Sequence, residues 1–269
     1  MKQEKKYLDN HKKTWLKKWK MKDAEEKYLY DLIFKYGCLV SENGEILTEN
    51  KLINESIKEH YGDKDFWNGV STYSISQYFP SVSEKVKVFM DSQIIPFVSK
   101  DTEMFSMACG SGENEFYLAD RVKLIDGYEY SEKMVRTATE QANKLGIENT
   151  KFNQANAANC RFNKVYDAGM SFALFAYLDD EAAIFASQNL ADSIKTGGKL
   201  YLRDTVNVCG EDMVYLFNYA NGFESQYRSY DNYMKLLREA GLKLEYEEVA
   251  NVSFICGKEF HLLNSVWRK

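Results

Sequence analysis

Short apolar segments alternate with amphipathic helical segments from residue 102 to the end of the chain. Strands are predicted over residues 104–109, 122–128, 151–154, 165–172, 199–204, 242–249 and 259–268, because each is a short apolar run between turn-forming or helical segments. Helices are predicted over residues 113–120, 131–145, 180–194 and 231–240. This alternation is typical of an α/β protein with a doubly wound, seven-stranded, mainly parallel sheet. Ligands of such sheets bind at the carboxyl ends of the strands.

The residues before 97 have a different pattern. Helices are predicted over residues 1–38 and 52–60, separated by a polar stretch that contains the turn pair Asn43-Gly44. The aromatic segment that follows, residues 65–79, is predicted to be a loop or a short helix. Ser81 and Glu84 have the spacing of a capping box, so a helix is predicted from there to about Pro96. The sequence therefore predicts an N-terminal helical cap, residues 1–96, and a sheet domain, residues 97–269.

The composition places the chain among globular proteins. Its 269 residues are 45% hydrophobic and 28% charged, which is close to the averages for folded domains. No apolar run approaches the roughly 20 residues that span a bilayer, and no apolar stretch of a signal peptide follows the lysine-rich N-terminus. The five cysteines are scattered and never in C-x-x-C spacing, which favours free thiols in a reducing cytoplasm over disulfides or a metal site.

The charge argues against a nucleic-acid-binding surface over the whole chain. The formal net charge is −5, whereas such surfaces are usually strongly basic. Residues 1–22 are nevertheless rich in lysine, and Trp15 and Trp19 lie four residues apart. This segment is interpreted either as a solvated helix that packs its tryptophans on the body of the protein or as a basic arm that faces an anionic substrate or partner. Membrane attachment is a third interpretation.

Four features fall at the predicted carboxyl ends of the strands. The turn 108–112 is rich in small residues, so its backbone can approach a ligand closely, and a helix N-terminus follows it. Glu129 ends the next strand, where a carboxylate suits a pair of ribose hydroxyls. Asn156-Ala157 can read an adenine edge, and residues 172–177 can wall a pocket. Each feature also has an ordinary structural interpretation, as a tight turn, a solvated glutamate, a polar loop or part of the core.

Taken together, these stretches resemble the class I S-adenosylmethionine-dependent methyltransferases. The resemblance is carried by residues 104–112, 126–134 and 154–157, and continues through 165–171, 194–200 and 233–242. It covers about residues 97–269 and implies an enzyme with a Rossmann-like methyltransferase fold. The implied cofactor is S-adenosylmethionine, which is released as S-adenosylhomocysteine.

The family's residue roles can be transferred to matching positions of this chain. The resemblance implies that the loop residues Ala108, Cys109, Gly110 and Gly112 lie under the methionine and ribose of the cofactor, and that Glu129 holds the ribose hydroxyls. It also implies that Tyr130 and Met134 pack on the adenine face, and that Asn156 and Ala157 meet the adenine edge. Phe172 is implied to lie near the methionyl end. Three positions depart from the family pattern. Ala108 replaces the usual first glycine, Ser106 replaces the usual acidic residue of the first strand, and Asn156 stands where aspartate is common.

The acceptor side is predicted from side-chain chemistry. A hydroxyl acceptor benefits from a general base, whereas an amine mainly needs to arrive unprotonated. His60 is the preferred base because it precedes the aromatic segment, which is predicted to close over the cofactor. Asp204, at the end of the fifth strand, is the second catalytic candidate. The predicted pocket walls are Tyr73, Tyr78, Tyr177, Tyr227, Arg228 and Tyr230.

These observations favour a small-molecule methyltransferase. The Asn-Pro-Pro-aromatic motif of nucleic-acid methylation is absent after the fourth strand, which disfavours nucleic acid as a substrate. The expected reaction is O-methylation of a polar sugar, nucleotide-linked or secondary metabolite, of which anionic ones are included, without a membrane partner. Two alternatives remain open, namely N-methylation of a small amine and a non-catalytic, cofactor-binding partner subunit.

Overall fold

The structure is a computed structural model that describes residues 38–41, 46–48, 82–217, 223–255 and 258–269. His60, Tyr73 and Tyr78 lie outside the described residues, as do most of the predicted N-terminal helices and the lysine-rich segment. Among the described residues, no helix combines the length and the apolar character that crossing a membrane requires.

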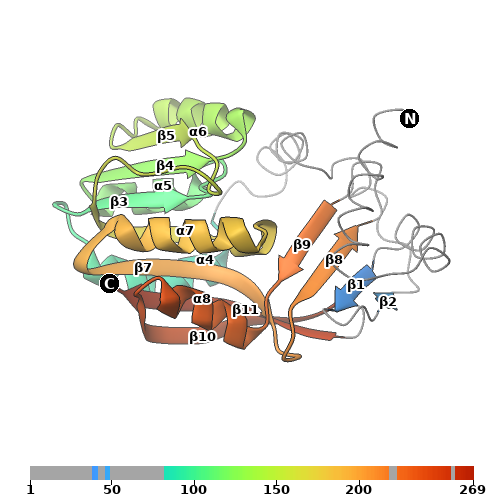
Figure 1. Cartoon of the computed structure of the whole chain (residues 1–269). Coiled ribbons are helices and arrows are strands. Elements are labelled where there is room, and N and C mark those ends of the chain that lie inside the picture. Colours follow the sequence, from blue (N-terminus) through green and yellow to red (C-terminus); the bar gives the residue numbers. More distant parts are fainter. Residues whose placement is uncertain (1–37, 42–45, 49–81, 218–222, 256–257) are drawn as a thin grey trace.

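A seven-stranded sheet forms the centre of the molecule (Figure 1). Its order is β10-β11-β7-β6-β3-β4-β5, and only β11 runs antiparallel to its neighbours. The strands are β3 (Glu103–Met107), β4 (Leu124–Glu129), β5 (Thr150–Gln154), β6 (Tyr166–Phe172), β7 (Ile194–Asn207), β10 (Lys243–Ile255) and β11 (Lys258–Arg268). The predicted α/β fold with a mainly parallel seven-stranded sheet is confirmed.

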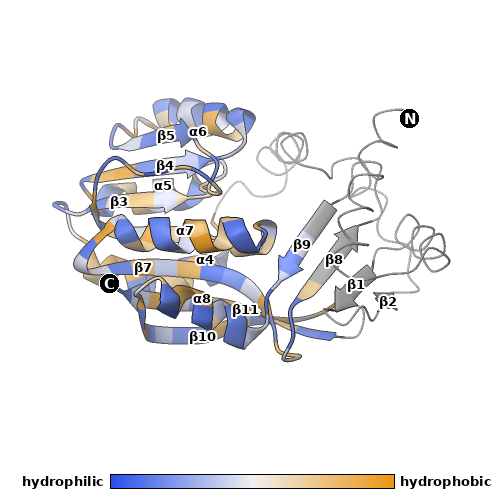
Figure 2. Ribbon diagram, in the orientation of Figure 1, coloured by the Kyte–Doolittle hydropathy of each residue, from blue (hydrophilic) through white to orange (hydrophobic). Residues whose placement is uncertain are grey.

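Helices cover both faces of this sheet (Figure 1). The helices are α4 (Glu84–Phe89), α5 (Glu113–Leu118), α6 (Glu132–Leu145), α7 (Asp180–Asp192) and α8 (Tyr230–Glu239). Side chains of α7 and α8 share one buried apolar cluster with the sheet, and side chains of α4 and α5 share the other. Figure 2 shows the apolar positions of α7 as bands between polar ones, as expected for a helix that buries one stripe. Polar side chains cap several helices, including Ser131 for α6 and Ser229 for α8.

The segment before β3 packs on the sheet. Ser83 caps α4, two residues after the predicted Ser81, and the helix continues into a π-helical turn and a 3-10 turn up to Phe97. Phe89, Met90 and Ile94 are fully buried in the cluster that α4 shares with the sheet. Residues 82–96, which the sequence pattern assigned to the cap, therefore contribute to the core of the sheet domain.

A second, four-stranded antiparallel sheet joins the N-terminal region to an insertion between β7 and α8. Its order is β2-β1-β8-β9, with β1 (Cys38–Ser41), β2 (Ile46–Thr48), β8 (Met213–Phe217) and β9 (Phe223–Tyr227). Cys38 lies in β1 and not at the end of a helix as predicted, and residues 46–48 of the predicted polar stretch form β2. The apolar triplets around Asn43-Gly44 pair as a hairpin, and β1 then pairs with β8, which is remote in sequence.

Candidate functional site

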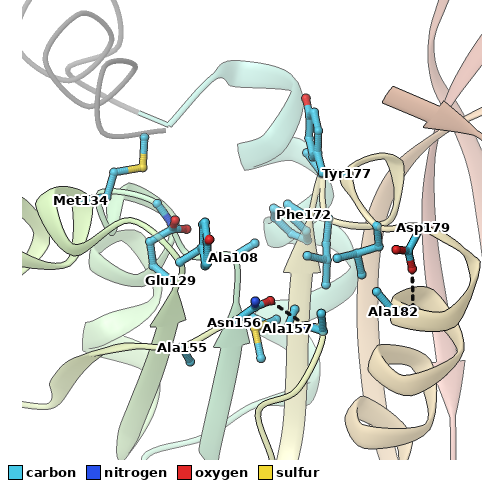
Figure 3. A pocket seen from close by; sticks show the side chains of 17 residues that line it. Ala108, Glu129, Met134, Ala155, Asn156, Ala157, Phe172, Tyr177, Asp179 and Ala182 are labelled. Atoms are coloured by element: carbon cyan, nitrogen blue, oxygen red, sulfur yellow. Dashed lines mark hydrogen bonds between the residues drawn. The ribbon is translucent and has the colours of Figure 1, made fainter. Parts of the chain in front are cut away.

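A pocket of about 530 Å³ opens at the carboxyl ends of β3, β4 and β6 (Figure 3). This volume is typical of a small-molecule site. Nine predicted site residues line it: Ala108, Gly110, Glu129, Tyr130, Met134, Asn156, Ala157, Phe172 and Tyr177. The remaining lining residues are Met107, Ala155, Ala158, Ala173, Leu174, Leu178, Asp179 and Ala182. Ala173 and Leu174 belong to the stretch 172–177 that was expected to wall a pocket, whereas the other six were not singled out, although most of them adjoin a predicted site residue in the chain.

The loop after β3 needs glycine for two different reasons. Gly110 and Gly112 both have positive φ angles, of 56° and 89°, which glycine adopts without steric cost. A Cβ on Gly112 would also lie 2.8 Å from the rings of Phe116 and Phe152. Neither Gly112 nor Cys109 lines the pocket. The Cys109 sulfur instead lies beneath the loop, 3.0 Å from where a Cβ on Gly127 would be.

Two alanines at the pocket have left-handed backbones. Ala108 follows β3 with a φ of 61°, and Ala173 follows β6 with a φ of 60°. No other non-glycine residue in the described part of the chain has a positive φ. Such residues cost about 1–2 kcal/mol each and are frequent at ligand sites, because tertiary contacts hold them in place. Ala108 thus adopts the backbone conformation that favours glycine, although the side chain differs from the family pattern.

Glu129 ties the glycine-rich loop to the start of α6. Its Oε2 accepts from the backbone N–H of Gly110 at 3.1 Å, and its Oε1 accepts from that of Ser131 at 2.8 Å. Burial raises the pKa of this carboxyl above its ordinary value, and the backbone donors oppose the rise. A carboxylate has about four acceptor positions, so Glu129 keeps acceptor capacity for a hydroxyl of a ligand beside its backbone donors. Its place beside the loop fits the expected ribose contact.

Asn156 and Ala157 form the next part of the pocket, just beyond β5. The Asn156 Oδ1 accepts from the backbone N–H of Ala158 at 2.9 Å, which fixes the side chain in an Asx turn. Its amide group remains as a donor toward the pocket (Figure 3). Met134 covers the glycine-rich loop, with its sulfur 3.9 Å from where a Cβ on Gly110 would be. This end of the pocket therefore presents hydrogen-bonding groups between flat or flexible apolar side chains, as an adenosine group requires.

The opposite end of the pocket is apolar. Phe172, Leu174, Tyr177 and Leu178 line it, and Figure 3 shows the rings of Phe172 and Tyr177 rising from the end of β6 and the turn after it. Asp179 closes this wall by capping α7, since its Oδ1 accepts from the backbone N–H of Ala182 at 2.8 Å. We call residues 172–179 the pocket wall.

Asp204 supports the pocket wall from behind. The sequence prediction that it points into the acceptor cleft was wrong, because it does not line the pocket and is 1% exposed. Its Oδ1 accepts from the backbone N–H groups of Leu174 and Phe175, both at 3.0 Å, and its Oδ2 accepts from the Tyr233 hydroxyl at 3.1 Å. Burial raises the pKa of Asp204 to about 6, although these hydrogen bonds lower it.

Arg228 also supports the wall, so its predicted place inside the pocket was wrong. Its guanidinium donates to the carbonyls of Phe175 and Leu178 at 2.8 and 3.0 Å and to the Asp180 carboxylate at 3.0 Å. The structure places two further predicted wall residues outside the pocket. Tyr227 packs against Phe260, and the Tyr230 hydroxyl donates to Glu247 at the surface.

A second buried acid lies beneath the glycine-rich loop. Glu115 of α5 is 0% exposed, and neither carboxylate oxygen has a hydrogen-bond partner among the described residues. Burial raises its pKa to about 7, and the nearby Ser106 hydroxyl opposes this rise without forming a hydrogen bond of normal geometry. Ser106 stands on β3 where the family usually has its acid. In this chain, Glu115 of α5 therefore supplies a carboxyl group near the position of Ser106.

Comparison with known proteins agrees with this geometry. Residues 105–198 match the methyltransferase-domain family. Among curated proteins, none matches the chain. An S-adenosylmethionine-dependent methyltransferase from Clostridium acetobutylicum has a similar structure, with a TM-score of 0.57 and 13% identity, over 75% of this chain and 98% of that one. A complex of DhpI with SAM and HEP gives a TM-score of 0.55 at 13% identity, over 76% and 94% of the two chains. The StiE O-MT segment gives 0.55 at 15% identity, over 69% and 73%.

Residues 105–198 therefore match a methyltransferase-domain family, and the fold around them is that of S-adenosylmethionine-dependent methyltransferases. The expectations of this family, of an enzyme and of S-adenosylmethionine as its cofactor are confirmed. The structural likenesses are under 25% identical and show the fold alone, so the acceptor has to be argued from the pocket.

Proposed function

We propose that the protein methylates an oxygen atom of a small polar acceptor, which binds at the apolar end of the pocket. The pocket wall carries this proposal, because its residues Tyr177 and Asp179 lie on the side of the cavity away from Glu129 and Met134 (Figure 3). When bound, S-adenosylmethionine supplies an electrophilic methyl group on a sulfonium sulfur. Glu129, Asn156 and Met134 would hold its adenosine part, and Phe172 would lie at its methionyl end.

The apolar wall supports oxygen as the nucleophile. Phe172, Leu174 and Leu178 exclude water and lower the local polarity, which favours reactions in which opposite charges neutralise one another. A hydroxyl acceptor then needs a base to take its proton. The described residues of the lining offer only Glu129 and Asp179 as charged groups, and both already accept hydrogen bonds from the backbone. His60, from the N-terminal region, is therefore retained as the proposed base.

We also propose that residues 1–81 close the pocket, with Tyr73 and Tyr78 against the cofactor or acceptor. Two anchors support this arrangement. One is the pairing of β1 with β8, whose neighbour β9 adjoins Arg228 and the pocket wall. The other is Lys85, whose Nζ donates to Asn251 at 2.9 Å and so fixes the start of α4 beside β10.

The cysteines Cys109, Cys160 and Cys209 are free thiols, in agreement with a reaction in the cytoplasm.

Transfer of a labelled methyl group tests the proposal. Full-length protein is incubated with methyl-labelled S-adenosylmethionine and a cell extract, which is separated by size into small molecules, nucleic acid and protein. We expect label in the small molecules, as methyl ethers or esters by mass spectrometry. Label confined to nucleic acid, protein or amines would contradict the proposal.

Two variants separate the parts of the site. Glu129→Ala is expected to weaken cofactor binding by about 1.5–3 kcal/mol in calorimetry, the range for hydrogen bonds to a charged group.

Removal of residues 1–80 is expected to abolish transfer while the sheet domain still binds S-adenosylhomocysteine. Full activity of the truncated protein would show that the acceptor pocket is built elsewhere.

A further inference from the structure

A row of polar side chains crosses the face of the sheet that α4 covers. Arg203 of β7 lies in register with Asn264 of β11, which lies in register with Glu248 of β10. The Arg203 Nη1 donates to the Asn264 Oδ1 at 2.5 Å, and the Asn264 Nδ2 donates to the Glu248 Oε1 at 2.7 Å. Asn264 is 1% exposed. A buried amide, itself held by a carboxylate, therefore fixes one corner of the guanidinium.

The other end of this row reaches the pocket. Phe172 of β6 lies in register with Arg203, and residues in register on neighbouring strands project from the same face about 4.8 Å apart. The Phe172 ring lines the pocket and also packs against Phe89, with ring centroids 6.0 Å apart. Arg203 therefore lies one strand beyond the apolar end of the pocket, on the side of the Phe172 ring.

The Arg203 guanidinium retains most of its hydrogen-bonding capacity. It has five N–H donors in a planar fork, and in the described part of the chain the Asn264 amide is the one group to which it donates. Arg228 differs, because three of its five donors are already taken by Phe175, Leu178 and Asp180. Arg203 is partly exposed, and burial lowers its pKa below the ordinary value. A partly desolvated cation with open donors is a favourable partner for an oxyanion.

The charged residues of the pocket also favour Arg203 as the partner of an anionic group. The charged residues that line it, Glu129 and Asp179, are both acidic. This arrangement suits a cationic cofactor and disfavours an anionic group inside the pocket itself. An acceptor with a carboxylate or phosphate group would therefore place that group outside the pocket, and Arg203 supplies the positive charge next to Phe172.

We propose that Arg203 binds a carboxylate or phosphate oxyanion of the acceptor, and thereby places the reacting oxygen at the apolar end of the pocket. The inference rests on the proposed function and narrows its substrate to anionic small molecules. Asn264 and Glu248 act as positioning residues, because Asn264 holds the guanidinium, Glu248 holds Asn264, and neither touches the acceptor.

Anion-exchange separation of the methylated products tests this inference. Wild-type protein, Arg203→Met, Arg203→Lys and the surface control Arg238→Met are each incubated with methyl-labelled S-adenosylmethionine and the small-molecule fraction of a cell extract. We expect the wild type and Arg238→Met to label compounds that the exchanger retains. Arg203→Met is expected to reduce this labelling at least tenfold, and Arg203→Lys to restore part of it, since a lysine keeps the charge without the planar fork.

Binding of S-adenosylhomocysteine to every variant, measured by calorimetry, shows that each is folded. If Arg203→Met does not fold, Arg203→Lys alone decides, with labelling below wild type as the expected result. Phosphatase treatment before the incubation distinguishes the two oxyanions, because it removes a phosphate ester and leaves a carboxylate. Unchanged labelling by Arg203→Met, or wild-type label confined to unretained compounds, would overturn the inference while the proposed function stands. No small-molecule label at all, with cofactor binding intact, would overturn both.

Discussion

The two ends of the pocket each rest on a buried acid, and the two acids differ in how they are satisfied. Asp204, behind the pocket wall, accepts three hydrogen bonds. Glu115, beneath the glycine-rich loop, has no hydrogen-bond partner among the described residues. Burial raises the pKa of both, to about 6 for Asp204 and about 7 for Glu115. Ionisation therefore costs stability at both acids. The bonded acid also organises its surroundings through its three hydrogen bonds, whereas the oxygens of the other acid are unpaired.

Loss of the Asp204 carboxylate is expected to have the largest effect. Asp204→Ala leaves two backbone N–H groups and the Tyr233 hydroxyl unpaired in the interior, so we expect a loss of about 3–5 kcal/mol in the free energy of unfolding. Denaturant unfolding measures it, with the surface variant Asp231→Ala as control. Asp204→Asn keeps an oxygen for the two N–H groups and should lose less. A loss below 1 kcal/mol for Asp204→Ala would show that the wall does not depend on this residue.

Substitution of Glu115 is expected to act in the opposite direction. Its pKa is higher in the folded than in the unfolded state, so it stabilises the fold in its protonated form, and this contribution is lost as the pH rises from about 4.5 to 7. Glu115→Gln keeps the shape without the charge. We expect it to be more stable than the wild type by about 3 kcal/mol at pH 8 and nearly equal at pH 4.5.

Unfolding of both proteins across this pH range checks the Glu115 prediction. The titration of Asp204 is present in both proteins and therefore cancels from their difference. A stability difference that does not depend on pH would show that Glu115 ionises at its ordinary pKa. The result sharpens the comparison, since it separates the cost of an unbonded carboxyl from the general cost of burial.

The smallest effects are expected at the two left-handed alanines, Ala108 and Ala173, which follow the neighbouring strands β3 and β6. Ala108→Gly and Ala173→Gly each remove the strain of a Cβ at positive φ, and part of this gain is offset by the greater freedom of glycine in the unfolded chain. We expect each to gain about 0.5–1 kcal/mol in unfolding free energy. Equal gains would indicate that the turns after β3 and β6 are held equally tightly. A loss of stability at either position would show that the alanine methyl group makes stabilising contacts there.

The sequence by itself determined the features that depend on neighbouring residues. Alternating strands and helices, the glycine-rich turn and the acid at the end of β4 are all local patterns. They were sufficient to identify the sheet, the methyltransferase family and one end of the pocket, because the carboxyl ends of consecutive parallel strands meet at one edge of a sheet. Eight of the ten predicted cofactor residues line the pocket. The two others, Cys109 and Gly112, shape the loop from below.

Only the tertiary structure decided the roles that depend on long-range contacts. Asp204 and Arg228 have the polar character of acceptor residues, but they support the wall because their hydrogen-bond partners lie 30 and 53 residues away in the chain. The pairing of β1 with β8 likewise joins two segments that lie far apart in the chain. Such partners are set by the order of strands in the sheets, and a local pattern carries no record of that order. Arg203 becomes informative for the same reason, since its neighbours Phe172 and Asn264 belong to adjacent strands.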